Sequence, residues 1–338
     1  MKELRFNLQL FAGNANTNVA TVTSEQGVDS LNPNVSVTMK TFYKTSLLEN
    51  ARNEHYFNQF GQKQPLPKNN GKKVEWRKFE TYDKATTPLV EGVTPDGNTV
   101  KMTKIEQEIK QYGDYTTISD RLELEAVDPI IVAVTEEHGA QAGDTVDTIT
   151  RNELMTGANV MFPNKRADRE HLVTGDLITP TLIDQAVTFL KKNHAPTING
   201  DYIAIIHPSV AYDLRESTAW LDVHKYAQPG EIYNGEIGKL HGVRFIENTE
   251  AKVWKSGDSA NAVYATTIFG KDAYGIIEPS AESMEVIVKQ RGSAGTSDPL
   301  DQRSTVGWKC SHAAKILYEE RLVRLETLSY FSDVDKAN

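Results

Sequence analysis

The sequence predicts a mixed α+β protein, and three segments carry this prediction. Residues 129–155 contain no proline after Pro129 and place apolar side chains at helical intervals, which predicts one long helix. Residues 178–295 combine amphipathic helical patterns with short runs rich in Ile and Val, which is typical of an α/β unit. Residues 62–118 contain two extended runs joined by a turn-rich segment, which predicts a long two-stranded excursion.

The long helix has a clear start and a weak apolar face. Asp128 is a good N-cap residue and Pro129 suits the first turn. Two glycines, Gly139 and Gly143, cost about 1 kcal/mol each in a helix interior. The apolar stripe is narrow and consists of Ile131, Val134, His138, Ala142, Val146 and Ile149. One compact core supports such a helix poorly, so we expect a rod that lies across a surface formed by other elements or other chains.

The N-terminal part divides into two segments. Residues 1–35 are polar and rich in Asn, Thr and Ser, which predicts an extended arm, although a disordered tail has the same composition. Residues 36–61 place apolar side chains at helix-like intervals and end at Gly61, which predicts a helix.

The excursion of residues 62–118 is too polar to bury both of its faces. Residues 65–71 predict a loop, 72–82 a first strand, 88–100 a turn region and 101–118 a returning strand. An isolated two-stranded ribbon is marginally stable in water. We therefore expect this ribbon to lie on another surface, from its own chain or from a neighbour.

The remaining chain predicts further helices and strands. Residues 119–127 form a short lead-in to the long helix, and a polar loop over 159–175 completes a segment that spans 119–177. Within 178–295 we predict helices from Thr179-Pro180 and from Pro208. The predicted strands there are 202–206, 243–247, 262–269 and 284–288. Residues 296–330 predict a loop and two strands, 305–317 and 321–327, before a polar tail at 331–338.

Composition excludes several classes of protein. The net charge is −9, which argues against a general affinity for DNA or anionic membranes, because phosphate contacts need an excess of Lys and Arg. A single cysteine, Cys310, rules out an internal disulfide framework. No apolar run approaches the roughly 20 residues of a membrane span. The expected protein is soluble and works in a reducing compartment.

No motif in the chain predicts catalysis. Residues 235–242 (GEIGKLHG) resemble a phosphate loop, but Leu240 stands where Ser or Thr must hold magnesium, so a Gly-rich turn before strand 243–247 is the better interpretation. His207 precedes Pro208 at a strand end, where α/β enzymes place catalytic groups. However, Ser209 lacks the glycine frame of a nucleophile elbow.

The remaining candidates for chemistry are also weak. Glu137-His138 has no second histidine one turn further along, as a zinc motif requires. Asp144 and Asp147 are one helical turn apart and could share a divalent ion, but such pairs are usually a solvated face. Cys310 is expected to be a small buried residue of a strand. We predict no catalytic residue, no cofactor and no metal.

Charge distribution is more informative. Residues 62–110 carry ten Lys and Arg against seven acids, whereas residues 120–157 carry two Arg against nine acids. Both surfaces could simply be solvated. The sharper hypothesis is that the basic ribbon of one subunit lies over the acidic helix of the next. The candidate contact residues are Lys72, Lys73, Trp76, Arg77 and Lys78 on the ribbon, and Glu136, Glu137, Asp144 and Asp147 on the helix.

The order of these parts resembles the major capsid proteins of tailed bacteriophages, which share the Hong Kong 97-type fold. Residues 7–12 (NLQLFA) are similar to the start of many head proteins of phages from Gram-positive hosts. Residues 235–245 (GEIGKLHGVRF) and 295–309 (GTSDPLDQRSTVGWK) resemble recurrent pieces of one phage capsid family. The resemblance covers nearly the whole chain.

The resemblance implies a fold with named parts. These are an N-terminal arm (1–35), a peripheral-domain entry helix (36–61), an extended β-hairpin loop (62–118), a long spine helix with part of the peripheral domain (119–177), an axial α/β domain (178–295), returning peripheral-domain strands (296–330) and a C-terminal tail (331–338).

The resemblance also implies a function. The subunit would form hexamers and pentamers of an icosahedral head that encloses double-stranded DNA without sequence-specific binding. Such heads are assembled in the bacterial cytoplasm with a portal and, in some cases, a decoration protein. About 35 residues precede the first predicted helix, too few for a scaffolding segment that folds alone, so we expect a separate scaffolding protein. The alternatives are another virion protein, such as a tail tube or ring, and a soluble α/β enzyme built on residues 178–295.

Overall fold

The computed structural model confirms a mixed α+β fold. It describes residues 56–66, 71–80, 82, 84–89, 91–94, 97–125, 130–217, 220, 236–256, 261–279, 284–293 and 298–338. The predicted arm at 1–35 and most of the helix predicted at 36–61 lie outside these residues. The chain divides into two compact units, each of which is described by itself.

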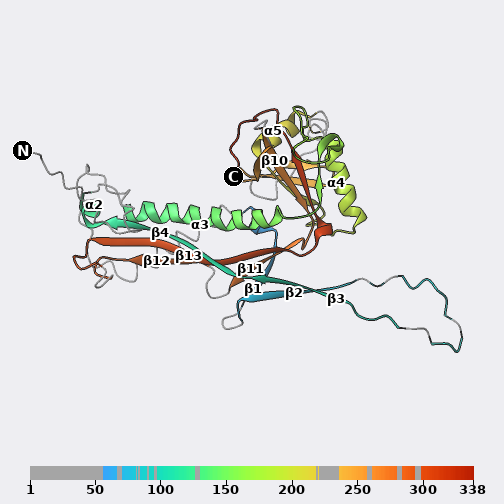
Figure 1. The fold of residues 1–338 in the computed structure, drawn as a ribbon, viewed down its shortest axis with the longest axis horizontal. Coiled ribbons are helices and arrows are strands. Elements are labelled where there is room, and N and C mark those ends of the chain that lie inside the picture. The colour runs from blue at the N-terminus through green and yellow to red at the C-terminus, as the bar shows by residue number, and fades with distance from the viewer. Residues whose placement is uncertain are drawn as a thin grey trace, which may run out of the picture. The chain divides into compact units, whose positions relative to one another are not determined.

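The first unit contains residues 111–147 and 282–312 and consists of a helix on a small sheet. Helix α3 (Ile130–Leu154) contributes its residues up to Asp147. Strands β4 (Lys110–Ser119) and β12 (Glu285–Lys289) both pair with β13 (Arg303–Ile316). Figure 1 shows α3 running along these strands. The short helix α2 (Asp120–Glu125) confirms the predicted lead-in.

The predicted long helix is confirmed to within one residue at each end. Ala142 and Val146 pack against Trp308 and Cys310 of β13. The buried stripe includes the predicted His138 and is wider than the pattern indicated, because it also includes Thr135, Gly139, Gly143 and Asp147.

The second unit contains residues 56–110, 148–281 and 313–338. Its main sheet has the strand order β5-β14-β10-β6-β8-β7, and β9 also pairs with β10. The strands are β5 (Val160–Met161), β6 (Tyr202–Ile206), β7 (Glu236–Leu240), β8 (Val243–Glu247), β9 (Val253–Ser256), β10 (Asn261–Phe269) and β14 (Leu322–Thr327). Strand β6 pairs in parallel with β8, and most other pairs are antiparallel.

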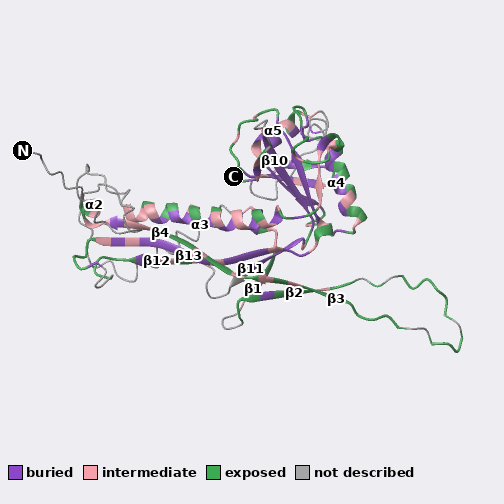
Figure 2. Cartoon of the chain, viewed as in Figure 1, coloured by how far each residue is buried: buried purple, intermediate pink, exposed green. Residues whose placement is uncertain are grey.

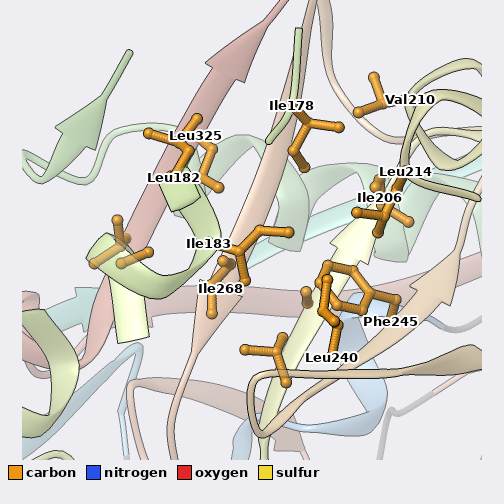
Figure 3. Packing of buried hydrophobic residues seen from close by; sticks show 14 of the residues in the cluster. Ile178, Leu182, Ile183, Ile206, Val210, Leu214, Leu240, Phe245, Ile268 and Leu325 are labelled. Carbon is orange, nitrogen blue, oxygen red and sulfur yellow. The ribbon is translucent and has the colours of Figure 1, made fainter. Parts of the chain in front are cut away.

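Two helices cover this sheet and confirm the predicted boundaries. Helix α4 (Pro180–Lys192) begins at the N-cap Thr179, whose hydroxyl accepts a hydrogen bond from the Leu182 amide. Its buried positions are the predicted ones: Leu182, Ile183, Ala186, Val187 and Leu190. Helix α5 (Pro208–Glu216) packs on the same cluster through Val210 and Leu214. Figure 3 shows these side chains interleaving with Ile206, Phe245 and Ile268.

Strand β6 is buried on both faces, as its continuous apolar sequence predicted. Ala204 and Ile206 face the cluster under α4 and α5. Ile203 and Ile205 join a second cluster with Phe57. Strands β5 and β14 belong to this sheet although they lie outside residues 178–295, whereas β11 (Tyr274–Pro279) and β12 lie within 178–295 but pair elsewhere. The sheet is therefore assembled from segments distant in the sequence.

The predicted excursion needs two corrections. A strand that was not predicted, β1 (Gln62–Leu66), overlaps the start of the loop predicted at 65–71 and pairs in parallel with β11. The returning strand is two strands, because β3 (Met102–Glu108) pairs with β2 (Lys73–Phe79) whereas β4 pairs with β13. Polar residues and Pro65 hid β1, since such a sequence is typical of a loop or a sheet edge.

Other strands were missed for similar reasons. Residues 235–242, predicted as a Gly-rich turn, contain β7, and the turn is only His241-Gly242, where both residues have positive φ angles of 51° and 79°. This tight turn joins β7 to β8 in a hairpin. Strands β5, β9 and β11 were also missed. Among the described residues, no helix is long and apolar enough to cross a membrane.

Candidate subunit-contact surfaces

The ribbon formed by β2 and β3 has two different faces. Val74 is 7% exposed and Trp76 is half-buried, and both pack in a cluster with Ile277 and Ala313. The alternate positions of β2 point outward and are exposed. Trp76 lies over the backbone of Gly275, where an added Cβ would come within 2.8 Å of the indole ring. One face thus anchors the ribbon to its own unit, and the other remains exposed.

The outward face carries a network of ion pairs centred on Lys104. Its ammonium group lies 2.8 Å from Glu75 Oε2 and also contacts Glu106. Arg77 donates a hydrogen bond of 2.8 Å to Glu75 Oε1, and Lys73 lies 3.7 Å from Glu106. The Lys104 hydrogen bonds lower the pKa of both carboxyl groups. Pairs this exposed contribute little to stability, but they neutralise part of the ribbon's basic charge.

The basic residues predicted as ribbon contacts therefore differ in whether their charge is already paired within the chain. Lys73 and Arg77 pair with acids of the ribbon itself. Lys78 lies 3.4 Å from Glu320 and 4.4 Å from the centre of the Tyr318 ring, so it is held by its own chain. Lys72 is exposed, and no side-chain partner is found for it among the described residues.

The predicted acidic surface of α3 is smaller than expected. Glu136, Glu137 and Asp144 are exposed, whereas Asp147 is 3% exposed and faces the interior. The pair Asp144 and Asp147 thus points in two directions and cannot present a shared divalent site at the surface. These residues belong to the first unit, whereas the ribbon belongs to the second.

The sequence analysis missed an apolar surface on the ribbon loop, residues 79–102. Figure 2 shows this loop as almost entirely exposed. The exposed apolar side chains are Phe79 (66%), Tyr82 (53%), Leu89 (79%), Val93 (63%), Val100 (67%) and Met102 (50%). Several exposed apolar side chains within one segment make the loop a candidate contact surface. The available signal was a set of apolar residues within a segment predicted to be a turn.

A groove of about 750 Å³ lies in the first unit, lined by β4, β12 and β13. Its floor includes Gly113 and Gly307, where an added Cβ would come within 2.5 Å and 2.7 Å of neighbouring atoms. Asp114 on its edge already accepts hydrogen bonds from Gln141 and from the Tyr115 amide. These hydrogen bonds lower the pKa of Asp114, so it is an ionised structural acceptor rather than a catalytic acid.

The candidates for catalysis have structural roles in this fold. His207 is the N-cap of α5, and its Nδ1 accepts a hydrogen bond of 3.2 Å from the Ser209 amide. The Ser209 hydroxyl donates to Asp335, 3.2 Å away, rather than to an imidazole. Cys310 is buried in β13, as predicted, and burial raises the pKa of its thiol to about 11. A thiol with this pKa is a poor nucleophile at neutral pH.

The described residues contain no cluster of three or more His, Cys, Asp and Glu side chains arranged to bind a metal ion. His138 on α3 is 6% exposed, and its Nδ1 lies 3.0 Å from Gln141 Oε1. The same Gln141 oxygen accepts a hydrogen bond of 2.9 Å from Trp308 Nε1. This histidine thus belongs to the packing between α3 and β13.

Comparison with solved structures shows which class of fold these surfaces belong to. The chain is similar to the capsid of Ralstonia phage GP4, with a TM-score of 0.63, 12% identity and coverage of 83% of this chain and 92% of that one. It is also similar to the capsid of cyanophage P-SCSP1u, with a TM-score of 0.61, 16% identity and coverage of 80% and 87%. The capsid of cyanophage Pam1 gives a TM-score of 0.60, 11% identity and coverage of 95% and 100%. The fold is that of phage capsid subunits.

Sequence comparison supports the same assignment. The model of a family described as phage capsid protein matches residues 103–325, and the chain belongs to this family. A search of curated proteins found no match. The chain is therefore a structural subunit of a bacteriophage head, located in the capsid of the virion, as the sequence analysis expected.

Proposed function

We propose that this capsid protein forms an icosahedral shell of the Hong Kong 97 type, built from hexamers and pentamers of the one chain and enclosing double-stranded DNA. In this proposal the ribbon loop is the extended loop, α3 is the spine helix, and the sheet with α4 and α5 forms the axial domain. The observation that carries the proposal is the exposed apolar surface of the ribbon loop, because the described residues of one chain leave it uncovered.

In the shell, the ribbon of one subunit lies over the α3 surface of a neighbouring subunit. The apolar side chains of the loop supply buried area, and charge sets the register. Lys72 is the best-placed basic contact because no described residue of its own chain neutralises its charge. Glu136, Glu137 and Asp144 are the acidic contacts, since they are exposed on α3. Weak individual contacts of this kind suit a shell, where each is repeated many times.

Electron microscopy of the purified chain tests the shell directly. We expect round, angular particles of uniform size, with or without co-expression of a scaffolding protein. A tube, an open ring or a small discrete oligomer would contradict the proposal. The same images at high resolution would show whether the ribbon loop crosses a neighbouring subunit.

Charge reversal tests the ribbon contact. The variant with Lys72, Lys73, Arg77 and Lys78 all changed to Glu is expected to lose shell formation while the subunit remains folded. Because Lys78 also contacts Glu320, the single change Lys72→Glu separates assembly from folding more cleanly. Normal particles from both variants would exclude charge complementarity.

A charge-swap variant provides the matched control. Combining Lys72→Glu with Glu136→Lys and Glu137→Lys should restore part of the lost assembly if these surfaces meet. The two Lys substitutions alone should impair assembly as Lys72→Glu does. Assembly yield is measured by sedimentation, and failure of the swap to rescue any particles would place the ribbon elsewhere.

The proposal extends to the other components of a head. A separate scaffolding protein guides assembly, a portal occupies one vertex, and a decoration protein can bind the finished shell. The subunit encloses DNA without sequence-specific contacts, which agrees with its net charge of −9. Purified heads analysed by mass spectrometry would identify these partners.

A further inference from the structure

The C-terminal residues carry a second exposed apolar surface, in a different part of the fold from the ribbon loop. Tyr330 is 82% exposed, Phe331 66% and Val334 76%. Tyr212 on α5 is 41% exposed, and its ring lies 5.3 Å from that of Phe331. We call these four residues the C-terminal apolar patch. They all belong to the second unit, and nothing in the proposed ribbon contact uses them.

The backbone that carries the patch is fixed to the sheet unit at its start. The Tyr330 amide donates a hydrogen bond of 3.0 Å to the Asp213 carboxylate on α5. One residue earlier, the Ser329 hydroxyl donates a hydrogen bond of 2.9 Å to the Ser209 carbonyl. Ser329 is 8% exposed, so the chain enters the patch from the interior.

Asp335 fixes the other side of the patch. One of its carboxylate oxygens accepts hydrogen bonds from Tyr264 at 2.6 Å and from Ser209 at 3.2 Å. The other accepts a hydrogen bond from Ser332 at 2.8 Å. Beyond it, Asn338 Oδ1 accepts a hydrogen bond of 2.9 Å from the Val253 amide on β9. The segment is thus held from residue 329 to residue 338.

Within residues 329–338, the hydrogen-bonded polar side chains and the large apolar side chains differ in their exposure. The side chains of Ser329, Ser332 and Asp335 hydrogen-bond within their own unit, whereas the large apolar side chains of the patch are exposed. Ordered backbone lowers the entropy cost of binding, because the side chains are already presented in one arrangement. Exposed Tyr and Phe in a fixed position are typical of the centre of a protein contact.

The size of the patch indicates what covers it. Aromatic side chains bury about 150–250 Å² each, so the four residues present on the order of 500 Å². A stable independent complex needs about 800 Å² from each partner. The patch alone therefore cannot recruit a separate protein, but it can contribute to a contact that is reinforced by neighbouring contacts in an assembly of identical chains.

We propose that the C-terminal apolar patch is a contact surface for a second copy of this chain within the shell. The inference rests on the proposed shell, and it adds a contact distinct from that of the ribbon. It predicts that the patch is exposed in the free subunit and covered in the particle.

Thiol labelling tests this directly because the chain has one native cysteine. Cys310 is 1% exposed and its raised pKa keeps the thiol unreactive, so a thiol introduced by Val334→Cys, which leaves the aromatic residues of the patch in place, is the only fast-reacting one. We expect labelling by a maleimide to slow by at least about tenfold on going from free subunits to particles. Unchanged labelling in intact particles would overturn the patch contact while leaving the shell intact.

A crosslinking experiment identifies the molecule that covers the patch. A photoreactive residue introduced by Val334→p-benzoylphenylalanine needs no access from solvent, and illumination of the assembled particles should give products of two or more capsid chains. A product that joins this chain to a different protein would overturn the second copy as the occupant. If the wild-type chain forms no closed particles in the microscope, the proposed shell itself fails, and that result is distinct from unprotected labelling.

Surface variants give an independent measurement. Tyr330→Ser combined with Phe331→Ser should raise the subunit concentration needed for assembly by about tenfold or more, because aromatic contacts dominate such interfaces. Leu300→Ser is the matched control, since Leu300 is 75% exposed but lies in the first unit. Equal denaturation midpoints for all variants would show that folding is unaffected, and equal assembly of the patch variant and wild type would contradict the proposal.

Discussion

The seven-stranded sheet and the β2–β3 ribbon use apolar residues for opposite purposes. In the sheet, Ile203 and Ile205 face one buried cluster while Ala204 and Ile206 face another, so both surfaces are closed by the chain itself. In the ribbon, only the face of Val74 and Trp76 is closed, and the loop exposes its apolar side chains. The apolar residues of the sheet therefore stabilise the folded subunit, whereas those of the ribbon loop are available for contact with another surface.

The physical reason for this difference is the number of layers. A sheet that is covered by helices on one face and by other segments on the other can bury nearly every apolar side chain. In the described part of the chain, no second layer covers the two-stranded ribbon beyond its anchored end, so its loop would gain burial from a further surface. Four predictions test the comparison, in order of decreasing effect.

Phe245→Ala should have the largest effect on folding. Phe245 is fully buried in the sheet cluster and meets the Trp220 ring edge-on at 5.8 Å. Its truncation leaves a cavity and should lower the free energy of unfolding by about 3–5 kcal/mol. Urea denaturation followed by circular dichroism measures this loss. A loss below about 1 kcal/mol would show that packing in the sheet is not the main contribution to the free energy of unfolding.

Leu89→Ser combined with Val93→Ser should impair assembly but leave the stability of the folded subunit almost unchanged. Both side chains are exposed in the ribbon loop, so the free energy of unfolding should change by less than about 0.5 kcal/mol. Assembly, measured by sedimentation of particles, should fall by about tenfold or more because buried apolar area between subunits is lost. Full assembly by this variant would break the comparison, since the loop would then carry no contact.

Trp76→Ala distinguishes the anchored end of the ribbon from its loop. The indole is half-buried against Gly275 and its cluster, so truncation should destabilise the subunit by about 2 kcal/mol, less than for a fully buried aromatic residue. Hydrogen exchange of the β2–β3 amides should rise more than that of β6. Trp76→Phe, which keeps most of the apolar contact, should show a smaller change, and equal changes in the two variants would argue against packing as the cause.

His207 gives the smallest expected effect, as a pH dependence of the sheet unit. Burial lowers the pKa of His207 from 6.5, despite the opposing effect of Asp335 and Glu250. The unfolded chain therefore takes up the proton first, so stability is complete above pH 6.5 and decreases as the pH falls below it. Protonation also removes the Nδ1 acceptor of the N-cap, a loss of about 1 kcal/mol.

The measurement is the unfolding free energy at pH 7.5 and pH 5.5 for wild type and His207→Asn. Asparagine keeps an N-cap acceptor but does not titrate, so the variant should lose less stability at the lower pH. The same pH dependence in both proteins would assign the effect to other groups.

Much of the fold followed from local sequence patterns. The helix at 130–154, the buried face of α4 and the boundaries of β6 and β8 were predicted because their signals are contained within each segment. Strands β1, β5, β7, β9 and β11 were missed, since they are short, polar or glycine-containing and are strands only because a partner lies beside them.

For the candidate contact surfaces, composition identified the charged residues but not their availability. Only the structure pairs Lys78 with Glu320, turns Asp147 inward and leaves Lys72 exposed. Burial and pairing of a charge depend on what packs against it from elsewhere in the chain, and no local pattern reports that.

The sequence by itself determined the α+β class, the long helix, the absence of a recognisable catalytic motif and the resemblance to phage capsid proteins, because periodicity and motif order are local properties. The tertiary structure decided which strands share a sheet, which half of the returning strand joins the ribbon, and which apolar residues of the loop and of the C-terminal patch remain uncovered. These depend on contacts between distant segments, and uncovered apolar surface is defined only once every other segment has taken its place.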